Sequence, residues 1–299
     1  MSYEVKKQQG GESTSLATRT AGIVLGYLIK NRDVIIGTLP EGFNYDRMCR
    51  SVVNAISTTP ALARCTVASL FLSTVRAFSI GLEPNGALQE GYLVPYGGEA
   101  QFLPSYRGLI QLARRSGEIS DVYAKAVYSN DTFEVEEGTE RKIVHKPDYS
   151  KDRGDAVCYY AMFRTTAGTV DFEVMSKKEI DKIRALSKAA NSPAWKEHYE
   201  EMAKKSVLKR LLKRAPMSID KAKNFSAAIE LENKAAMGET QSDAVLDIEG
   251  LDMPDESATP AEVQREINAD RAEELKAKLA EKKGAAAAAT ATETSDSLM

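Results

Sequence analysis

The pattern of apolar residues changes twice along the chain, and this order limits the fold more than any other feature. Apolar residues recur at helical spacing over 17–30, 43–58 and 67–80. Short strand-like segments follow near 121–128, 132–136, 141–145, 156–165 and 169–175, and helical patterns then return. Separate runs of helices, strands and further helices predict an α+β fold with an antiparallel sheet.

Helix-capping residues support these assignments. Thr66 can cap the helix over 67–80, and Gly81 supplies the residue that ends it. Ser176 and Glu179 have the spacing of a capping box, which predicts a helix that begins at Lys177. N-terminal helices, a hairpin and sheet, and C-terminal helices should therefore follow one another along the chain.

The ends of the chain differ in composition from its middle. Residues 1–15 are polar and predict a disordered arm, whereas 16–235 carry the apolar residues of a core. Residues 236–260 are acidic and poor in large apolar groups, which is typical of a linker. Residues 261–299 predict a charged helix and a low-complexity tail that could bind a partner protein. We therefore expect a chain shortened after residue 238 to stay folded, and the acidic tail to be mostly disordered.

Charge is distributed unevenly. Residues 216–299 hold 9 Lys/Arg and 18 Asp/Glu, whereas residues 1–215 hold 31 and 25. A basic body with an acidic tail is typical of proteins that bind nucleic acids. No apolar run approaches the roughly 20 residues of a membrane helix, and the first residues lack the apolar segment of a signal peptide. We expect a cytoplasmic protein without membrane contact.

Patterns for catalysis or metal binding are scarce. Cys49, Cys65 and Cys158 form no Cys-x-x-Cys pair, and neither His145 nor His198 has a second ligand at zinc spacing. The sequence has no phosphate-binding loop of the ATPase type and no nucleophile-elbow motif. We therefore predict a protein that is not an enzyme and that needs no cofactor and no metal.

Basic and aromatic residues gather in two segments, as in proteins that bind single-stranded nucleic acids through phosphates and bases. The first segment is a predicted hairpin that turns at Gly97-Gly98, together with the helix after it. Its members are Tyr92, Tyr96, Phe102, Tyr106, Arg107, Arg114 and Arg115. We expect Tyr92 and Phe102 in the core, and Tyr106-Arg107-Gly108 at the DNA because glycine allows a close approach of the backbone.

The second segment is a helix that Ser192 and Pro193 predict to run unbroken from 193 to about Ala215. Placed at about 100° per residue, its later turns separate a basic arc from an apolar face. The arc consists of Lys205, Lys209, Arg210, Lys213 and Arg214, and the apolar face includes Val207, Leu208, Leu211 and Leu212. Trp195 and Tyr199 project on the basic side of an unbroken helix, where they would either stack on bases or pack against the sheet.

These segments resemble the RecT family of phage annealing recombinases. Three motifs carry the resemblance, which spans about Thr59 to Ser218: GLEPNGALQEGYLVPYGGEAQFLPSYRGLIQLARRSG, FEVMSKKEIDKIRALSKA and AWKEHYEEMAKKSVLKRLLKRAPMS. Ser105 stands where family members often have glycine. The resemblance implies that the chain binds single-stranded DNA and pairs complementary strands without ATP during phage-type homologous recombination.

The resemblance also implies partners and binding residues. Family members form rings or helical filaments, hold single strands and the annealed duplex intermediate in a basic groove, and act with an exonuclease and the host single-stranded-DNA-binding protein. The candidate DNA-binding residues here are Tyr106, Arg107, Arg114, Arg115, Lys188, Trp195, Lys204, Lys205, Lys209, Arg210 and Lys213. A scaffold for double-stranded nucleic acids and a metal-dependent nuclease are the alternatives.

Overall fold

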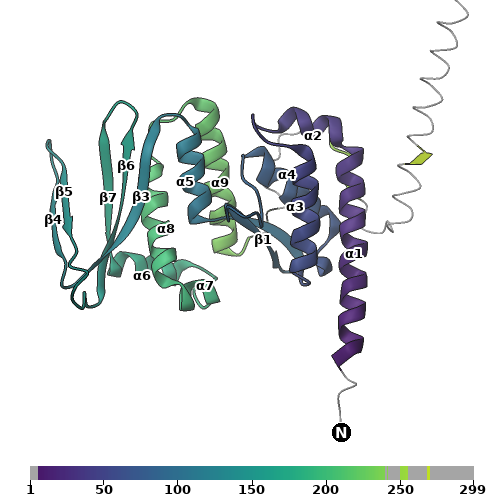
Figure 1. The fold of residues 1–299 in the computed structure, drawn as a ribbon, viewed down its shortest axis with the longest axis horizontal. Helices are drawn as coiled ribbons and strands as arrows, with labels where there is room; N and C mark the ends of the chain where they lie inside the picture. The colour runs from purple at the N-terminus through teal and green to yellow at the C-terminus, as the bar shows by residue number, and fades with distance from the viewer. Residues whose placement is uncertain (1–5, 240, 242–249, 255–267, 270–299) are drawn as a thin grey trace, which may run out of the picture.

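The structure is a computed structural model that describes residues 6–239, 241, 250–254 and 268–269, without the side chains of 6–15, 193–194 and 220. Helices, antiparallel sheets and further helices follow one another along the chain (Figure 1), which confirms the predicted α+β class. No helix in these ranges is long and apolar enough to cross a membrane. The charged helix and tail predicted for 261–299 lie outside the described residues, apart from 268–269.

Helices form the N-terminal part of the molecule, with α1 at one end of it (Figure 1). They are α1 (Lys6–Lys30), α2 (Arg32–Thr38), α3 (Tyr45–Thr58), the 3-10 turn η1 (Leu62–Arg64) and α4 (Val67–Ser79). The Thr66 side chain accepts a hydrogen bond from the Ser69 N–H at 3.3 Å, and Gly81 has a φ of 86°, so both predicted ends of α4 are confirmed. Because α1 already begins at Lys6, the arm expected over 1–15 is helical from that residue.

A hairpin and a short helix come next. Strands β1 (Gly91–Tyr96) and β2 (Glu99–Pro104) pair antiparallel, and α5 (Tyr106–Arg115) follows. Leu93 and Phe102 face each other across the hairpin and are buried, as expected for Phe102. Tyr92 points to the opposite face of the strand and is 40% exposed, so its expected place in the core is wrong.

The Ser105–Gly108 step fixes the exit of this hairpin. The Ser105 side chain caps α5 by accepting a hydrogen bond from the Gly108 N–H at 3.1 Å. A Cβ atom at Gly108 would lie 2.0 Å from the Glu90 carbonyl oxygen, so only glycine fits there. This packing places Tyr106 and Arg107 in the first turn of α5, beside the hairpin.

The larger sheet has the strand order β3 (Ile119–Tyr128), β6 (Ala156–Thr165), β7 (Val170–Ser176). Strands β4 (Thr132–Glu136) and β5 (Lys142–Lys146) form a separate hairpin at the opposite end of the molecule from α1 (Figure 1). The Asp131 carboxylate, which is 0% exposed, holds this hairpin, because it accepts hydrogen bonds from Arg153 and from His145, whose Nε2 lies at 3.0 Å. The hydrogen bond from Arg153 keeps the pKa of Asp131 well below its usual range.

The C-terminal helices are α6 (Lys177–Leu186), α7 (Pro193–Glu197), α8 (Tyr199–Leu212) and α9 (Ile219–Met237). The capping box of Ser176 and Glu179 is present, as predicted. The unbroken helix over 193–215 is wrong, because His198 leaves the helical conformation with φ −128° and ψ 41° and separates α7 from α8. Helix α9 had no counterpart among the expected elements.

Part of the predicted acidic linker packs on the body. Gln241 is 1% exposed, and its side chain pairs with the backbone of β2: it accepts from the Phe102 N–H and donates to the Phe102 carbonyl, both at 2.9 Å. The backbone of Asp252 pairs with the side chain of Asn31: the Asp252 N–H donates to the Asn31 Oδ1 at 2.6 Å, and the Asp252 carbonyl accepts from the Asn31 Nδ2 at 2.9 Å. Gln241 and Asp252 thus contact the body from within the predicted linker over 236–260, and we expect the boundary of the folded body to lie beyond residue 252.

We therefore expect a chain shortened after residue 238 to melt below the full-length chain, and one shortened after 254 to melt with it. Gln241→Ala leaves the buried Phe102 N–H and carbonyl unpaired, which should lower the free energy of unfolding by about 1–3 kcal/mol and the melting temperature by about 2–12 °C. Glu239→Ala is the control, because Glu239 bonds to Gln101 through its backbone and its side chain is exposed. Thermal unfolding measures all four, and equal melting of the 1–238 and full-length chains would contradict this boundary.

Candidate nucleic-acid interface

A cavity of about 860 Å³ brings the two predicted segments together. Its walls come from the β1–β2 hairpin and the start of α5 on one side, and from the α6–α7 region, α8 and α9 on the other. Tyr106 and Arg107 line it from the first segment, and Trp195, Lys205 and Lys209 line it from the second. The fold therefore places residues from both sequence clusters around one hollow.

The aromatic residues of the cavity differ in exposure. Trp195 is 3% exposed and packs edge-on against Tyr199, with 5.8 Å between the ring centroids. Of the two roles considered for Trp195, the structure has the packed one. Tyr106 is half-buried, its hydroxyl accepts from the Ala124 N–H at 3.1 Å, and burial raises its pKa. Tyr92 lines the same cavity and is 40% exposed.

The basic arc of α8 is not a free surface, because one part of it faces a carboxylate of α9. The Lys209 ammonium contacts Glu232, and the Lys205 Nζ lies 3.4 Å from a Glu232 oxygen. Burial lowers the pKa of Lys205, and the charge of Glu232 opposes this shift. Burial would raise the pKa of Glu232, but the two lysines outweigh it and lower that pKa. Lys205 and Lys209, two of the candidate DNA-binding residues, are therefore ion-paired in the structure.

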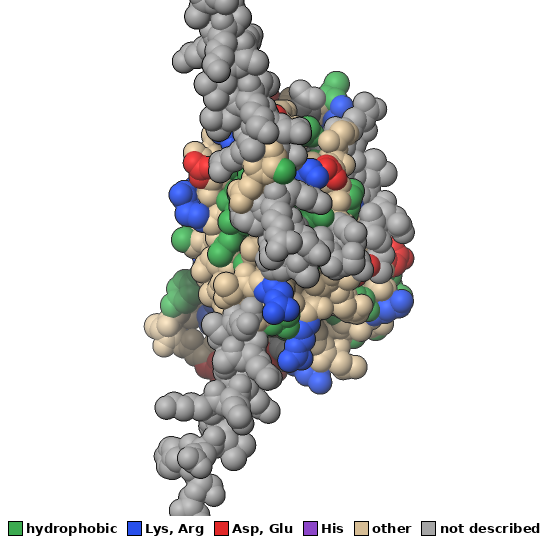
Figure 2. All heavy atoms as spheres, turned by 90° about the vertical axis from the view of Figure 1, so that its right-hand side faces the viewer, with side chains coloured by type: hydrophobic (Ala, Val, Ile, Leu, Met, Phe, Trp, Pro, Cys, Tyr) green, Lys and Arg blue, Asp and Glu red, His purple; other side chains and the backbone are tan. Residues whose placement is uncertain are grey.

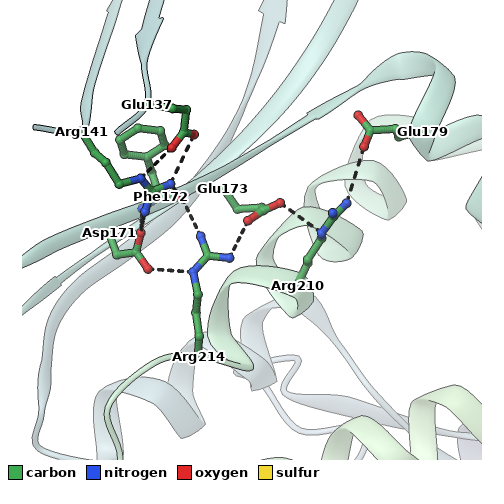
Figure 3. A network of polar contacts seen from close by, with 8 residues as sticks. All are labelled: Glu137, Arg141, Asp171, Phe172, Glu173, Glu179, Arg210 and Arg214. Carbon is green, nitrogen blue, oxygen red and sulfur yellow. Dashed lines mark hydrogen bonds and ion pairs between the residues drawn. The ribbon is translucent and has the colours of Figure 1, made fainter. Parts of the chain in front are cut away.

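The other part of the arc faces strand β7 (Figure 3). Arg210 lies 3.0 Å from Glu173 and 3.6 Å from Glu179, and Arg214 lies 2.8 Å from Asp171. Arg214 also donates to the Phe172 carbonyl at 2.7 Å, beside a second donor from Arg141. These guanidinium groups hold α8 against the edge of the sheet, so Arg210 is engaged in the fold rather than presented to the cavity.

Three further candidates are also paired. Arg115 contacts Glu90, which is 1% exposed, and donates to the Gly81 carbonyl. Arg114 lies 3.4 Å from Asp121, and Lys204 contacts Glu201. The Arg115–Glu90 pair fixes the loop before β1, where Gln89 adopts a φ of 53° and lines the cavity. Arg115 therefore acts on the cavity by positioning this loop.

Arg107, Lys188 and Lys213 are exposed, and they have no carboxylate partner within the described part of the chain. Arg107 lines the cavity, and Lys188 lies between two lining residues, Ser187 and Ala189. Elsewhere, on the face at the α1 side, Lys and Arg side chains stand in separate groups among hydrophobic and uncharged ones (Figure 2). Arg107 and Lys188 are thus cations at the cavity that can bind a phosphate without breaking an ion pair.

The sequence did not identify several cavity residues. Ile183, Leu186 and Met237 form an exposed apolar wall, and Leu186 is 74% exposed. The exposed side chain of Tyr92 belongs to the same hollow and could have been assigned to it from strand alternation with buried Leu93. No pattern in the sequence predicts that Glu232 contacts two lysines of another helix.

No candidate metal centre is found in the part of the chain that the structure describes. Among the residues whose placement is described, no group of three or more His, Cys, Asp or Glu side chains could hold an ion. Cys49, Cys65 and Cys158 are free thiols, and burial raises the pKa of each. The cavity presents cations, side-chain amides and apolar faces, which are groups suited to binding a ligand.

Comparison with known proteins finds a matching family model and two similar proteins. The RecT family model matches residues 46–244, a range that contains every residue lining the cavity. Protein RecT of Escherichia coli (strain K12) is 34% identical over 239 residues, which cover 77% of this chain and 87% of that protein. Uncharacterized protein YqaK of Bacillus subtilis (strain 168) is 26% identical over 186 residues, 62% of each chain.

The different exposure of Trp195 and Tyr92 predicts different effects of their removal. Trp195→Ala should lower the free energy of unfolding by about 3–5 kcal/mol, because it opens a cavity in the core. Tyr92→Ala should change it by less than about 1 kcal/mol, since its ring is partly in water. Chemical denaturation measures both. A Trp195→Ala protein as stable as the wild type would show that the ring is not part of the core.

Proposed function

The chain belongs to the RecT family, and we propose that it binds single-stranded DNA in this cavity and anneals complementary strands without ATP during phage-type homologous recombination. Family membership supports a role in recombination by single-strand annealing. The observation that carries the proposal is the meeting of Arg107, Tyr106 and Tyr92 with the lysines of α8 around one hollow. These residues come from both segments that resemble the family.

The chemistry of the cavity suits an unpaired strand better than a closed duplex. An unpaired base presents an apolar face that can pack on Tyr92 or on the apolar wall at Leu186. In a duplex the base faces are stacked on one another and only the edges are accessible. Arg107 and Lys188 then hold the phosphates on either side of the inserted bases.

Annealing itself needs no chemical step. Base pairing and stacking make the joining of complementary strands favourable, so the protein has to reduce phosphate repulsion and keep bases accessible. Cations at the rim do the first, and the apolar hollow does the second. The proposal therefore includes no catalytic residue and no cofactor.

The remaining parts of the proposal concern assembly. We place the protein in the bacterial cytoplasm, as a ring or helical filament whose successive cavities hold one strand and then the annealed duplex intermediate. The proposed partners are an exonuclease that exposes single strands and the host single-stranded-DNA-binding protein. Membership of the RecT family is the support for these partners.

Removing the two rim cations tests where the strand binds. In Arg107→Ala/Lys188→Ala, affinity for oligo(dT) should fall, and the slope of log affinity against log salt should decrease by about 1.4 per protomer, about 0.7 for each lost phosphate contact. Lys142→Ala/Lys151→Ala removes the same charge from exposed positions on and near the β4–β5 hairpin. Equal salt slopes for the two double variants, measured by fluorescence anisotropy, would place the strand elsewhere.

Annealing should proceed at the same rate with and without ATP. Two complementary oligonucleotides, one carrying a fluorophore and one a quencher, report pairing directly. The full-length chain should accelerate quenching and should bind oligo(dT) more tightly than the preformed duplex. A strict requirement for ATP, or stronger binding to the duplex, would overturn the proposal in favour of a different kind of DNA-binding protein.

A further inference from the structure

Glu232 places a carboxylate between two lysines on the cavity wall. We propose that Lys205 and Lys209 form a phosphate-binding subsite that Glu232 occupies in the DNA-free chain, so that Glu232 limits the affinity for single-stranded DNA. This inference rests on the proposed function, because it concerns the same cavity. It adds an internal competitor for the bound strand.

The three side chains have the arrangement of an occupied anion site. One Glu232 oxygen contacts the Lys209 ammonium and the other lies 3.4 Å from Lys205. The exposed fractions are 8% for the Glu232 side chain, 12% for Lys205 and 20% for Lys209. All three line the cavity. Each carboxylate oxygen therefore meets its own ammonium group at the wall that a bound strand would contact.

A phosphate group can replace this carboxylate. Both groups present two oxygens that accept charge-assisted hydrogen bonds from ammonium groups. Two lysines and one glutamate leave a net charge of about +1, so the cluster still attracts an anion. Lys209 also donates to the Asn233 side chain at 3.0 Å, so it keeps a partner while the carboxylate and the phosphate exchange.

The helix that carries Glu232 is fixed next to the cavity rim. The Ala236 carbonyl accepts hydrogen bonds from the Lys188 N–H at 3.0 Å and from the Ser187 hydroxyl at 3.2 Å. Glu232 lies one helical turn earlier on the same helix. The backbone thus keeps the carboxylate opposite the lysines, and only its side chain has to move when a strand enters.

A purely structural role for Glu232 makes a different prediction. If the ion pairs served only to pack α8 on α9, neutralising Glu232 would lower stability and would leave affinity for DNA unchanged or weaker. If Glu232 competes with phosphate, neutralising it frees two cations and strengthens binding. The sign of the change in affinity separates the two roles.

The test is Glu232→Gln in the full-length chain, which keeps the shape of the side chain and removes its charge. We expect roughly tenfold tighter binding of labelled oligo(dT) at low salt, measured by fluorescence anisotropy. The control is Glu230→Gln, which makes the same charge change on the same helix. Glu230 is 62% exposed, lies 3.7 Å from Lys234 and does not line the cavity. The Glu230→Gln variant should therefore bind oligo(dT) with the affinity of the wild type.

The same substitution in a lysine variant tests whether the gain in affinity depends on the lysines. In Lys209→Ala, the gain from Glu232→Gln should shrink severalfold, because one of the two freed cations is absent. If Glu232→Gln does not fold, as thermal unfolding will show, Glu232→Asp takes its place. It keeps the charge but withdraws the carboxylate by one methylene, and it too should bind more tightly than the wild type.

Unchanged or weaker binding by a folded Glu232 variant would overturn the inference, as would equal tightening by Glu230→Gln. These failures are distinct from a failure of the proposed function. A competitor role can fail while the wild-type chain still binds oligo(dT) and loses salt dependence in Arg107→Ala/Lys188→Ala. If that rim variant behaves like the wild type, the strand is not in the cavity, and both ideas fall together.

Discussion

Burial of one face of α8 determines where the candidate DNA-binding side chains lie. Val207, Leu208 and Leu211 are fully buried, and the helix packs across the sheet strands and α5. Each such side chain stabilises the fold by about 1.5–3 kcal/mol. Turning the helix about its axis would lose this free energy of burial. The cations of α8 must then lie on its flanks, beside α9 and beside β7.

That orientation explains why so many cations of the body are paired. A lysine or arginine next to a packed surface loses water, and it needs a carboxylate or a carbonyl in its place. Glu232 supplies this for Lys205 and Lys209, and Asp171 for Arg214. The number of cations in residues 1–215 is therefore a poor guide to the binding surface, because ion pairs inside the fold engage many of them.

The sequence predicted the elements whose signals are local. The ends of α4, the capping box of α6 and the hairpin strands depend on residues a few positions apart, so Thr66 and Ser176 sufficed. The break at His198, the docking of Gln241 on β2 and the pairing of Glu232 depend on residues far apart in the chain. The cavity was predictable in part: both segments were identified, but the helical wheel could not say which carboxylates would face the cations.

The cavity combines two kinds of cation, and their difference bears on annealing. At the rim, Arg107 and Lys188 can bind a phosphate without breaking an ion pair, so first contact with a strand meets little resistance. In the proposed competition, Lys205 and Lys209 exchange Glu232 for the phosphate, and the carboxylate returns when the strand leaves. An annealing protein has to hold a single strand and then release the duplex. Because Glu232 can pair with Lys205 and Lys209 again, the site binds the strand less tightly than two free lysines would. The lower affinity makes release of the paired product easier.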